Sequence, residues 1–207
     1  MKTQLCALAS GLALAFAGTA AFAGSTGNTY QNGFNNDAAI TQAYNASASA
    51  SINQMGNSHV AKATQKDNWF GPSSIDITQR GYNQYANATQ THTAFSSSKI
   101  VQKGDRNVAN TTQEYALGVK SDVYQDGYKN TANVKQTSSV DADAKIVQLG
   151  AQNVANVTEK NGWHQRADLY QNGYMNTATV MQTGSNLSAT AVQIGAFNTA
   201  TFNQTGW

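Results

Sequence analysis

Apolar and polar residues alternate in short runs along most of the chain, and these runs recur at a nearly fixed distance. In one such run Ile100 precedes Gln102 by two residues, and in the next run Asn107 precedes Ala109 by two. A period of two is typical of a β-strand with one buried face. The sequence therefore predicts pairs of short strands, and the two strands of each pair are joined by a turn.

One pattern, Gln-x-Gly-x-x-Asn-x-Ala-x-x-x-Gln, occurs eight times and covers the chain from Thr29 to the C-terminus. Successive copies begin 22 to 25 residues apart. The leading Gln, numbered position 0 below, is Gln31, Gln54, Gln79, Gln102, Gln125, Gln148, Gln171 and Gln193. A repeat of this length indicates a solenoid, because one unit can bury its inner face only against stacked neighbours.

Gly at +2 and Ala at +7 occur in every copy. Gly adopts a positive φ without steric penalty, so we expect a first turn at about +2 to +4. We expect a second turn at about +12 to +16, where Asn161-Gly162 and Thr183-Gly184 lie. The turn glycines are Gly33, Gly56, Gly81, Gly104, Gly127, Gly150, Gly173 and Gly195. The alanines, small enough for two sheets to approach closely, are Ala38, Ala61, Ala86, Ala109, Ala132, Ala155, Ala178 and Ala200.

Amide side chains recur at three inward positions, and we expect each row to form a ladder in which every amide donates to the amide of the next repeat. Besides the leading Gln, the +5 row contains Asn36, Asn107, Asn130, Asn153, Asn176 and Asn198. The +11 row contains Gln42, Gln65, Gln90, Gln113, Gln136, Gln182 and Gln204. Glu159 interrupts the +11 row, and since a carboxylate only accepts, we expect Gln136 and Gln182 both to donate to it.

These patterns predict an all-β fold, a parallel β-solenoid. Eight β-arch repeats would stack as eight rungs about 4.8 Å apart, with two parallel sheets facing each other across a thin core. Such a stack can extend into cross-β fibrils. Residues 24–207 would form a single domain of eight repeats without a linker.

Residues 1–23 have the pattern of a signal peptide. Lys2 is followed by an apolar run from Leu5 to Ala17, and Ala21-Phe22-Ala23 is a small-x-small cleavage site. The apolar run is shorter than the roughly 20 residues of a membrane-spanning helix. Cys6, the only cysteine, lies in this segment, so the mature chain would have no thiol and no disulfide.

Composition and charge narrow the possible functions. The chain contains 22 Asn and 19 Gln, and its 13 basic and 11 acidic residues nearly balance. This balance argues against a nucleic-acid-binding surface, which would be basic. The stretch from Gln171 to Trp207 has no charged residue at all. Natural sheets normally protect their edges with charge, so an uncharged edge predicts pairing with another copy, head to tail.

The repeat resembles the curlin repeat of curli subunits, through the pattern quoted above and its eight recurrences. The resemblance implies a secreted structural subunit of an extracellular, adhesive amyloid fibre in the biofilm matrix of a Gram-negative bacterium. It also implies self-assembly, export through an outer-membrane secretion pore, nucleation by a minor subunit, and no cofactor. The regular, uncharged last copy from Gln193 to Gln204 favours the major subunit over the minor nucleator.

Two other functions compete with this interpretation. An enzyme would need clustered catalytic groups or metal ligands, whereas His59, His92 and His164 fall at different positions of the repeat. We therefore expect no catalytic residue, no metal site and no bound cofactor. A solenoid that binds a flat lattice or a polysaccharide would need an unbroken Thr row, and the +10 row is broken by Lys135 and Met181.

Overall fold

The computed structural model describes residues 24–68 and 70–207. The predicted signal peptide, residues 1–23, lies outside the described residues, as do Cys6 and Trp69. The described part of the chain forms β-strands without any helix, and no helix in it could therefore cross a membrane.

Sixteen strands build two parallel sheets of eight strands each. The first sheet consists of β1 (Thr26–Asn32), β3 (Ala48–Asn57), β5 (Ser73–Tyr82), β7 (Ser97–Asp105), β9 (Lys120–Tyr128), β11 (Asp143–Ala151), β13 (Arg166–Tyr174) and β15 (Ser188–Ala196). The second consists of β2 (Asp37–Ala43), β4 (Val60–Lys66), β6 (Tyr85–Thr91), β8 (Val108–Glu114), β10 (Thr131–Val140), β12 (Val154–Trp163), β14 (Thr177–Thr183) and β16 (Thr199–Thr205).

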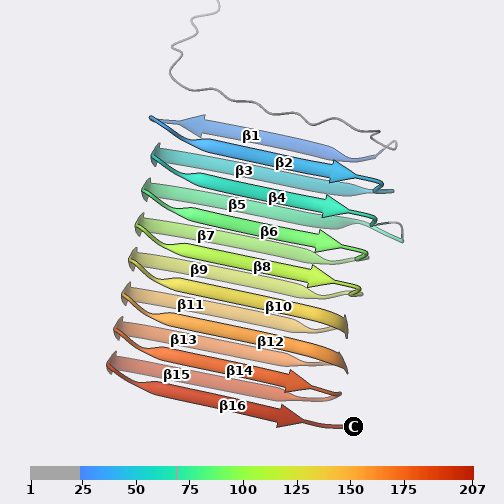
Figure 1. Ribbon diagram of the computed structural model, residues 1–207, viewed down its shortest axis with the longest axis vertical. Coiled ribbons are helices and arrows are strands. Elements are labelled where there is room, and N and C mark those ends of the chain that lie inside the picture. Colours follow the sequence, from blue (N-terminus) through green and yellow to red (C-terminus); the bar gives the residue numbers. More distant parts are fainter. Residues whose placement is uncertain (1–23, 69) are drawn as a thin grey trace, which may run out of the picture.

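One odd-numbered strand and the even-numbered strand after it form one rung, and the rungs are stacked in sequence order (Figure 1). Each strand pairs with its equivalent one repeat later, so that identical positions are superposed. Gln102 lies beside Gln125, for example, and Ala109 beside Ala132. The predicted fold, a parallel β-solenoid of eight rungs with two facing sheets, is confirmed.

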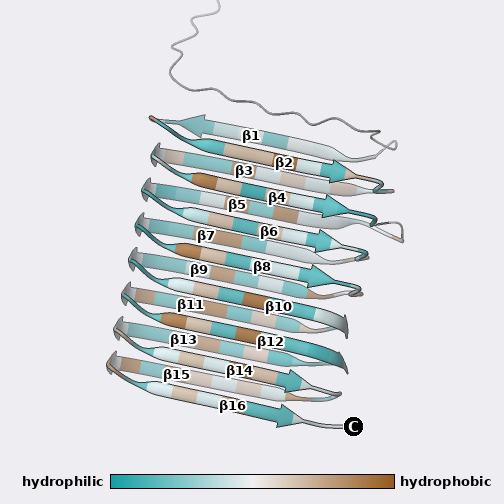
Figure 2. Ribbon diagram, viewed as in Figure 1, coloured by the Kyte–Doolittle hydropathy of each residue, from teal (hydrophilic) through white to brown (hydrophobic). Residues whose placement is uncertain are grey.

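The core is thin and is filled alternately by the two sheets. The first sheet contributes large aliphatic residues at −2, such as Ile100 and Ile146, which are fully buried. The second contributes the +7 alanines, of which Ala109 and Ala132 have no exposed surface. Polar and apolar residues accordingly alternate along the strands (Figure 2). A small residue facing a large one allows the sheets to approach while the interior remains filled.

The first turn is tighter, and lies later, than the sequence predicted. In seven rungs, all but the first, the strand continues through +3, and the chain reverses at +4 and +5. The +2 glycines have φ between 93° and 135°, and a Cβ on Gly127 would overlap the carbonyl oxygen of Gly150 in the next rung. The +4 residues also have positive φ, between 49° and 58°, although they include Lys129 and Met175. This conformation costs about 1–2 kcal/mol in a non-glycine residue.

A main-chain hydrogen bond between rungs offsets that cost. The N–H of Lys129 donates to the carbonyl oxygen of Asp105 at 2.9 Å, and that of Met175 donates to Ala151 at 3.0 Å. Because any residue type except proline has this N–H, the +4 position tolerates many side chains. For the same reason the composition at +4 gave no signal of the unusual backbone.

Candidate assembly interface

The leading Gln residues form an uninterrupted amide ladder between the sheets. All seven links between consecutive rungs are present, with Nε2 to Oε1 distances of 2.7 to 2.9 Å. Gln102, fully buried, donates from Nε2 to Gln125 and also to the carbonyl oxygen of Tyr85, at 3.0 Å. Both Nε2 hydrogens are thereby bonded, which removes the penalty of burying an amide.

The +11 residues form a second ladder, which lies near the second turn of each repeat. Six of its seven links are present, from Gln42 to Glu159 and from Gln182 to Gln204. Nε2 of Gln113 and Nε2 of Gln136 also donate to carbonyl oxygens of the first sheet, those of Ser97 and Lys120, at 3.0 and 2.9 Å. The ladder thus bonds the two sheets to each other as well as joining the rungs.

Both Gln ladders have one direction. In every link the donating Nε2 belongs to the earlier rung and the accepting side-chain oxygen to the later rung. The second bond of Nε2, to a main-chain carbonyl, fixes this direction, because a reversed amide would place Oε1 against another acceptor. The last rung therefore ends the ladders with Nε2 of Gln193 and Gln204, and the first rung begins them with Oε1 of Gln31 and Gln42.

The +5 asparagines bond mainly to the main chain, and amide-to-amide links of the predicted kind join only the rungs from Asn130 to Asn198. Oδ1 of Asn130 accepts the N–H of Asn153 at 3.0 Å, and Nδ2 of Asn130 donates to the carbonyl oxygen of Gly150 at 2.9 Å. The shorter Asn side chain reaches the turn beside it, where main-chain groups need partners. Side-chain links in this row belong to the later rungs and run in the opposite direction, as from Asn198 to Asn176.

His59 replaces Asn at +5 in the second rung and makes equivalent bonds. Its Nδ1 lies 3.4 Å from the N–H of Gln84, and its Nε2 lies 3.2 Å from the carbonyl oxygen of Met55. Burial lowers the pKa of His59, although hydrogen bonds to the main chain of Met55 and Gly81 act in the other direction. A neutral imidazole with its proton on Nε2 fits both contacts.

Glu159 leaves the +11 ladder incomplete on one side only. Gln136 donates to Oε2 of Glu159 at 2.8 Å, but Gln182 donates elsewhere, so the expectation that both neighbours donate is wrong. Oε1 of Glu159 and Oε1 of Gln182 are both buried without a hydrogen-bond partner. In the rungs with Gln at +11 the second side-chain atom is a donating Nε2, as in Gln136, whereas Oε1 of Glu159 has no hydrogen to donate.

Burial raises the pKa of Glu159 to about 7; the hydrogen bond from Gln136 lowers it, and the nearby Asp143 carboxylate raises it. When Glu159 is neutral, its carboxyl hydrogen can lie on Oε1 and be donated to Oε1 of Gln182, which otherwise has no hydrogen-bond partner.

The second turn contains buried polar residues that the sequence interpretation missed. Oδ1 of Asn45 accepts the N–H of Asn68 at 3.1 Å, and Oδ1 of Asn68 accepts the N–H of Thr93 at 2.8 Å. These residues occupy position +14 in the first three rungs. Later rungs have Ala116 and Ser139 there, so the residue type at +14 does not recur along the chain and the repeat pattern gave no signal of this row.

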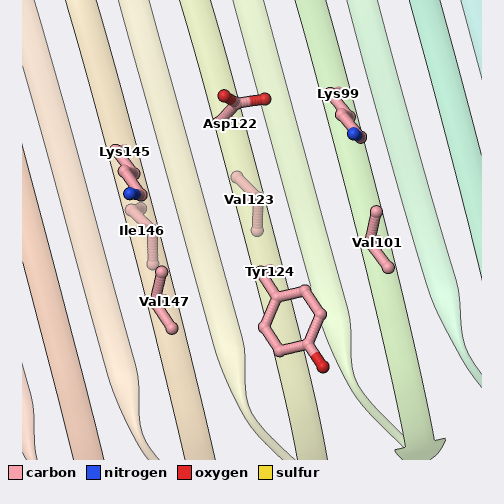
Figure 3. A pocket seen from close by; sticks show the side chains of 8 residues that line it. All are labelled: Lys99, Val101, Asp122, Val123, Tyr124, Lys145, Ile146 and Val147. Carbon is pink, nitrogen blue, oxygen red and sulfur yellow. The ribbon is translucent and has the colours of Figure 1, made fainter.

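Charges alternate in sign from rung to rung on the outer face of the first sheet. Figure 3 shows part of this row, Lys99, Asp122 and Lys145, with Val101, Tyr124 and Val147 in the row beside it. The full charged row is Asp76, Lys99, Asp122, Lys145 and Asp168, in register on successive strands. Each exposed neighbouring pair contributes only about 0.2–1 kcal/mol. A slip by one rung would place like charges together, so the row selects the correct register.

Large and small side chains also alternate from rung to rung on the outer surface of the last four rungs. The −1 position is Tyr124, Val147, Tyr170 and Val192 in the last four rungs. The +3 position is Tyr128, Ala151, Tyr174 and Ala196 in the same rungs. The first rung has the large residues Tyr30 and Phe34 at these positions, and the last rung has the smaller Val192 and Ala196. The two end rungs therefore differ in side-chain size in the same way as two neighbouring rungs of the last four.

The two end rungs expose apolar surface and unpaired strand edges. On the first rung Tyr30 is 55% exposed and Phe34 is 65% exposed. On the last rung Ile194 and Phe197 are each 70% exposed. No group of three or more His, Cys, Asp or Glu residues that could hold a metal ion occurs among residues 24–68 and 70–207.

The family model of the curlin associated repeat matches residues 166–195. This segment comprises β13, β14 and most of β15, and it includes the start of the uncharged stretch at Gln171. Searches of curated proteins and of solved structures found no match.

Proposed function

We propose that this curlin-repeat protein is the major structural subunit of an extracellular curli-type amyloid fibre, and that it assembles head to tail through its end rungs. The observation that carries the proposal is that both sheets and both Gln ladders remain open at each end. The groups left open at one end are complementary to those left open at the other. The proposal makes the chain a structural protein and not an enzyme.

The junction between copies would continue the pairing seen inside the chain. Strand β15 would pair with β1 of the next copy, and β16 with β2. Nε2 of Gln193 and of Gln204 would then donate to Oε1 of Gln31 and of Gln42 in the next copy. Nδ2 of Asn198 would donate to the carbonyl oxygen of Gly33, as Asn176 does to Gly195 at 2.9 Å.

The outer surface supports the same junction. Val192 on the last rung would be followed by Tyr30 of the next copy, and Ala196 by Phe34. The alternation of large and small side chains would therefore run through the junction without a fault. At +3 an aromatic residue occupies every second rung along the whole stack, so an even number of rungs, eight, keeps this alternation in phase across the junction.

The distribution of charge supports growth at the ends only. Central rungs have charged outer faces and are paired on both sides, so they cannot accept another chain. The last rung has no charge, and the first has only Asp37. Charges near the centre act as gatekeepers against association in a wrong register.

The biological setting of the proposal rests on the family match and on residues 1–23. The chain would be exported with that segment as a cleaved signal peptide and leave a Gram-negative cell through an outer-membrane pore. A minor subunit would nucleate the fibre, which would serve in biofilm cohesion and cell adhesion. The minor nucleating role is the second candidate, and the uncharged last rung favours the major role.

Incubation of the purified chain tests the proposal. We expect fibres that give a cross-β reflection near 4.8 Å, and we expect fragments of these fibres to seed the assembly of fresh monomer. A chain that stays monomeric, with or without seeds, would refute it. A chain that accelerates another subunit but does not elongate its own fibres would show the nucleating role. Binding to a polysaccharide without fibre formation would instead show a lattice-binding solenoid.

A further inference from the structure

We propose that the junction between copies is chemically directional: the last rung is a hydrogen-bond donor face and the first rung an acceptor face in the +11 ladder. A carboxylate in that ladder should consequently block docking from the last rung and permit it from the first. This inference rests on the proposed head-to-tail assembly. Its partner is a second copy of this chain.

The direction comes from the second hydrogen bond of each Nε2. On the last rung Nε2 of Gln204 donates to the carbonyl oxygen of Ser188 at 2.9 Å, and its Oε1 accepts from Gln182 at 2.8 Å. The remaining hydrogen of Nε2 points to where the next copy would dock. On the first rung Nε2 of Gln42 already donates to Gln65 at 2.8 Å and to Thr26 at 3.0 Å. Only its Oε1 is left for a preceding copy.

Glu159 shows inside the chain what a carboxylate does to such a ladder. Its link to the earlier rung is intact, since Gln136 donates to it at 2.8 Å. Its link to the later rung is lost, and the facing oxygen of Gln182 has no partner. One carboxylate thus keeps the acceptor side and removes the donor side.

Gln204 and Gln42 offer a matched pair of substitutions in one ladder. Gln204→Glu keeps the bond from Gln182 within the chain but loses the bond to Ser188, and it would bring a carboxylate against Oε1 of Gln42 when the next copy docks. Gln42→Glu would lose its bonds to Gln65 and to Thr26 within the chain, and would still accept from Gln204 of a preceding copy. Both variants place one new negative charge at an end rung, so a general effect of charge is common to both.

Elongation of wild-type seeds by each full-length variant, imaged on single fibres at pH 8, tests the inference. We expect Gln204→Glu to elongate seeds at least roughly tenfold more slowly than Gln42→Glu, as the loss of one buried link implies. Unfolding of each monomer by denaturant should show the reverse order, with Gln42→Glu the less stable.

A capping experiment gives a second, independent readout. Wild-type seeds exposed briefly to Gln204→Glu and then to wild-type monomer should stop growing at one end and continue at the other. Seeds treated with Gln42→Glu should grow at both ends. At a pH low enough to protonate the carboxylate that Gln204→Glu introduces, growth of the capped end should recover, because the neutral acid donates.

Each outcome separates the two proposals. Wild-type fibres that form normally, with equal slowing by both variants or capping of both ends, would overturn the directional junction and leave the fibre subunit standing. Wild-type chain that forms no fibre would overturn the proposed function itself. A Gln204→Glu monomer that fails to fold in the denaturant assay would contradict the assignment of its lost donor to the junction.

Discussion

Replacing Glu159 with Gln should remove a pH dependence of stability that is built into the core. Glu159 is fully buried in β12, and its Oε1 has no hydrogen-bond partner. Gln at this position would restore a donating Nε2, with the carbonyl oxygen of Asp143 and Oε1 of Gln182 as the equivalent acceptors. The variant should therefore complete the +11 ladder from the first rung to the last.

The size of the effect follows from the pKa. Glu159 has a pKa of about 7 in the folded chain, against 4.5 without the fold. A difference of this size corresponds to roughly 3 kcal/mol. Because the folded pKa is raised, this stability is fully present below pH 4.5 and is lost as the pH rises through about 7. Over that range the wild-type free energy of unfolding should fall relative to that of Glu159→Gln.

Denaturant unfolding of dilute monomer at about pH 4, 6 and 8 would measure this. We expect the difference in unfolding free energy between Glu159→Gln and wild type to grow by roughly 3 kcal/mol between about pH 4 and pH 8. Glu114→Gln is the matched control: it removes the same charge from an outward position on β8, and its slope should match that of wild type. Parallel pH profiles for Glu159→Gln and wild type would refute the reasoning.

The remaining predictions concern assembly and the intact ladder. Glu159→Gln should also speed fibre growth near neutral pH, measured by seeded elongation, and growth no faster than wild type would contradict this. Gln102→Leu leaves the buried amides of Gln79 and Gln125 without their bonds to Gln102 and should destabilise the fold by about 3 kcal/mol, with slower fibre assembly; unchanged unfolding and growth would show the row to be incidental. Ala200→Asp, at an inward site of the last rung, should abolish elongation, while Thr199→Asp on the outer face should matter much less; equal elongation rates would refute head-to-tail growth.

The fold could be predicted because strict periodicity leaves few arrangements. Alternation at Ile100 and Gln102, and again at Asn107 and Ala109, assigned the inner face of each strand. The spacing of the repeats then assigned the partner of each strand, since only the equivalent strand of the next repeat presents the same pattern. Register, parallel direction and rung number all follow from these two periods.

Side-chain reach and backbone geometry could not be read from the same pattern. Asn and Gln have the same amide, but Asn130 is one methylene shorter and its Nδ2 donates to the turn, whereas Nε2 of Gln125 donates to the amide of Gln148. The positive φ at +4 is stabilised by main-chain bonds that nearly every residue type can make, so composition does not reveal it. The break at Glu159 was visible in the sequence, but its one-sided character depends on the direction of the ladder.

The direction of the ladder also determines which part of the stack Glu159 weakens. Its missing link faces β14, so the last two rungs are joined to the rest of the stack by an incomplete +11 ladder. The main-chain pairing of β12 with β14 and the complete leading ladder remain across this boundary. Ionisation of Glu159 should therefore loosen the last two rungs before the rest, and the final one would receive the next copy. A pH that weakens the core would then first weaken the end that presents the last rung, because both depend on the same row of amides.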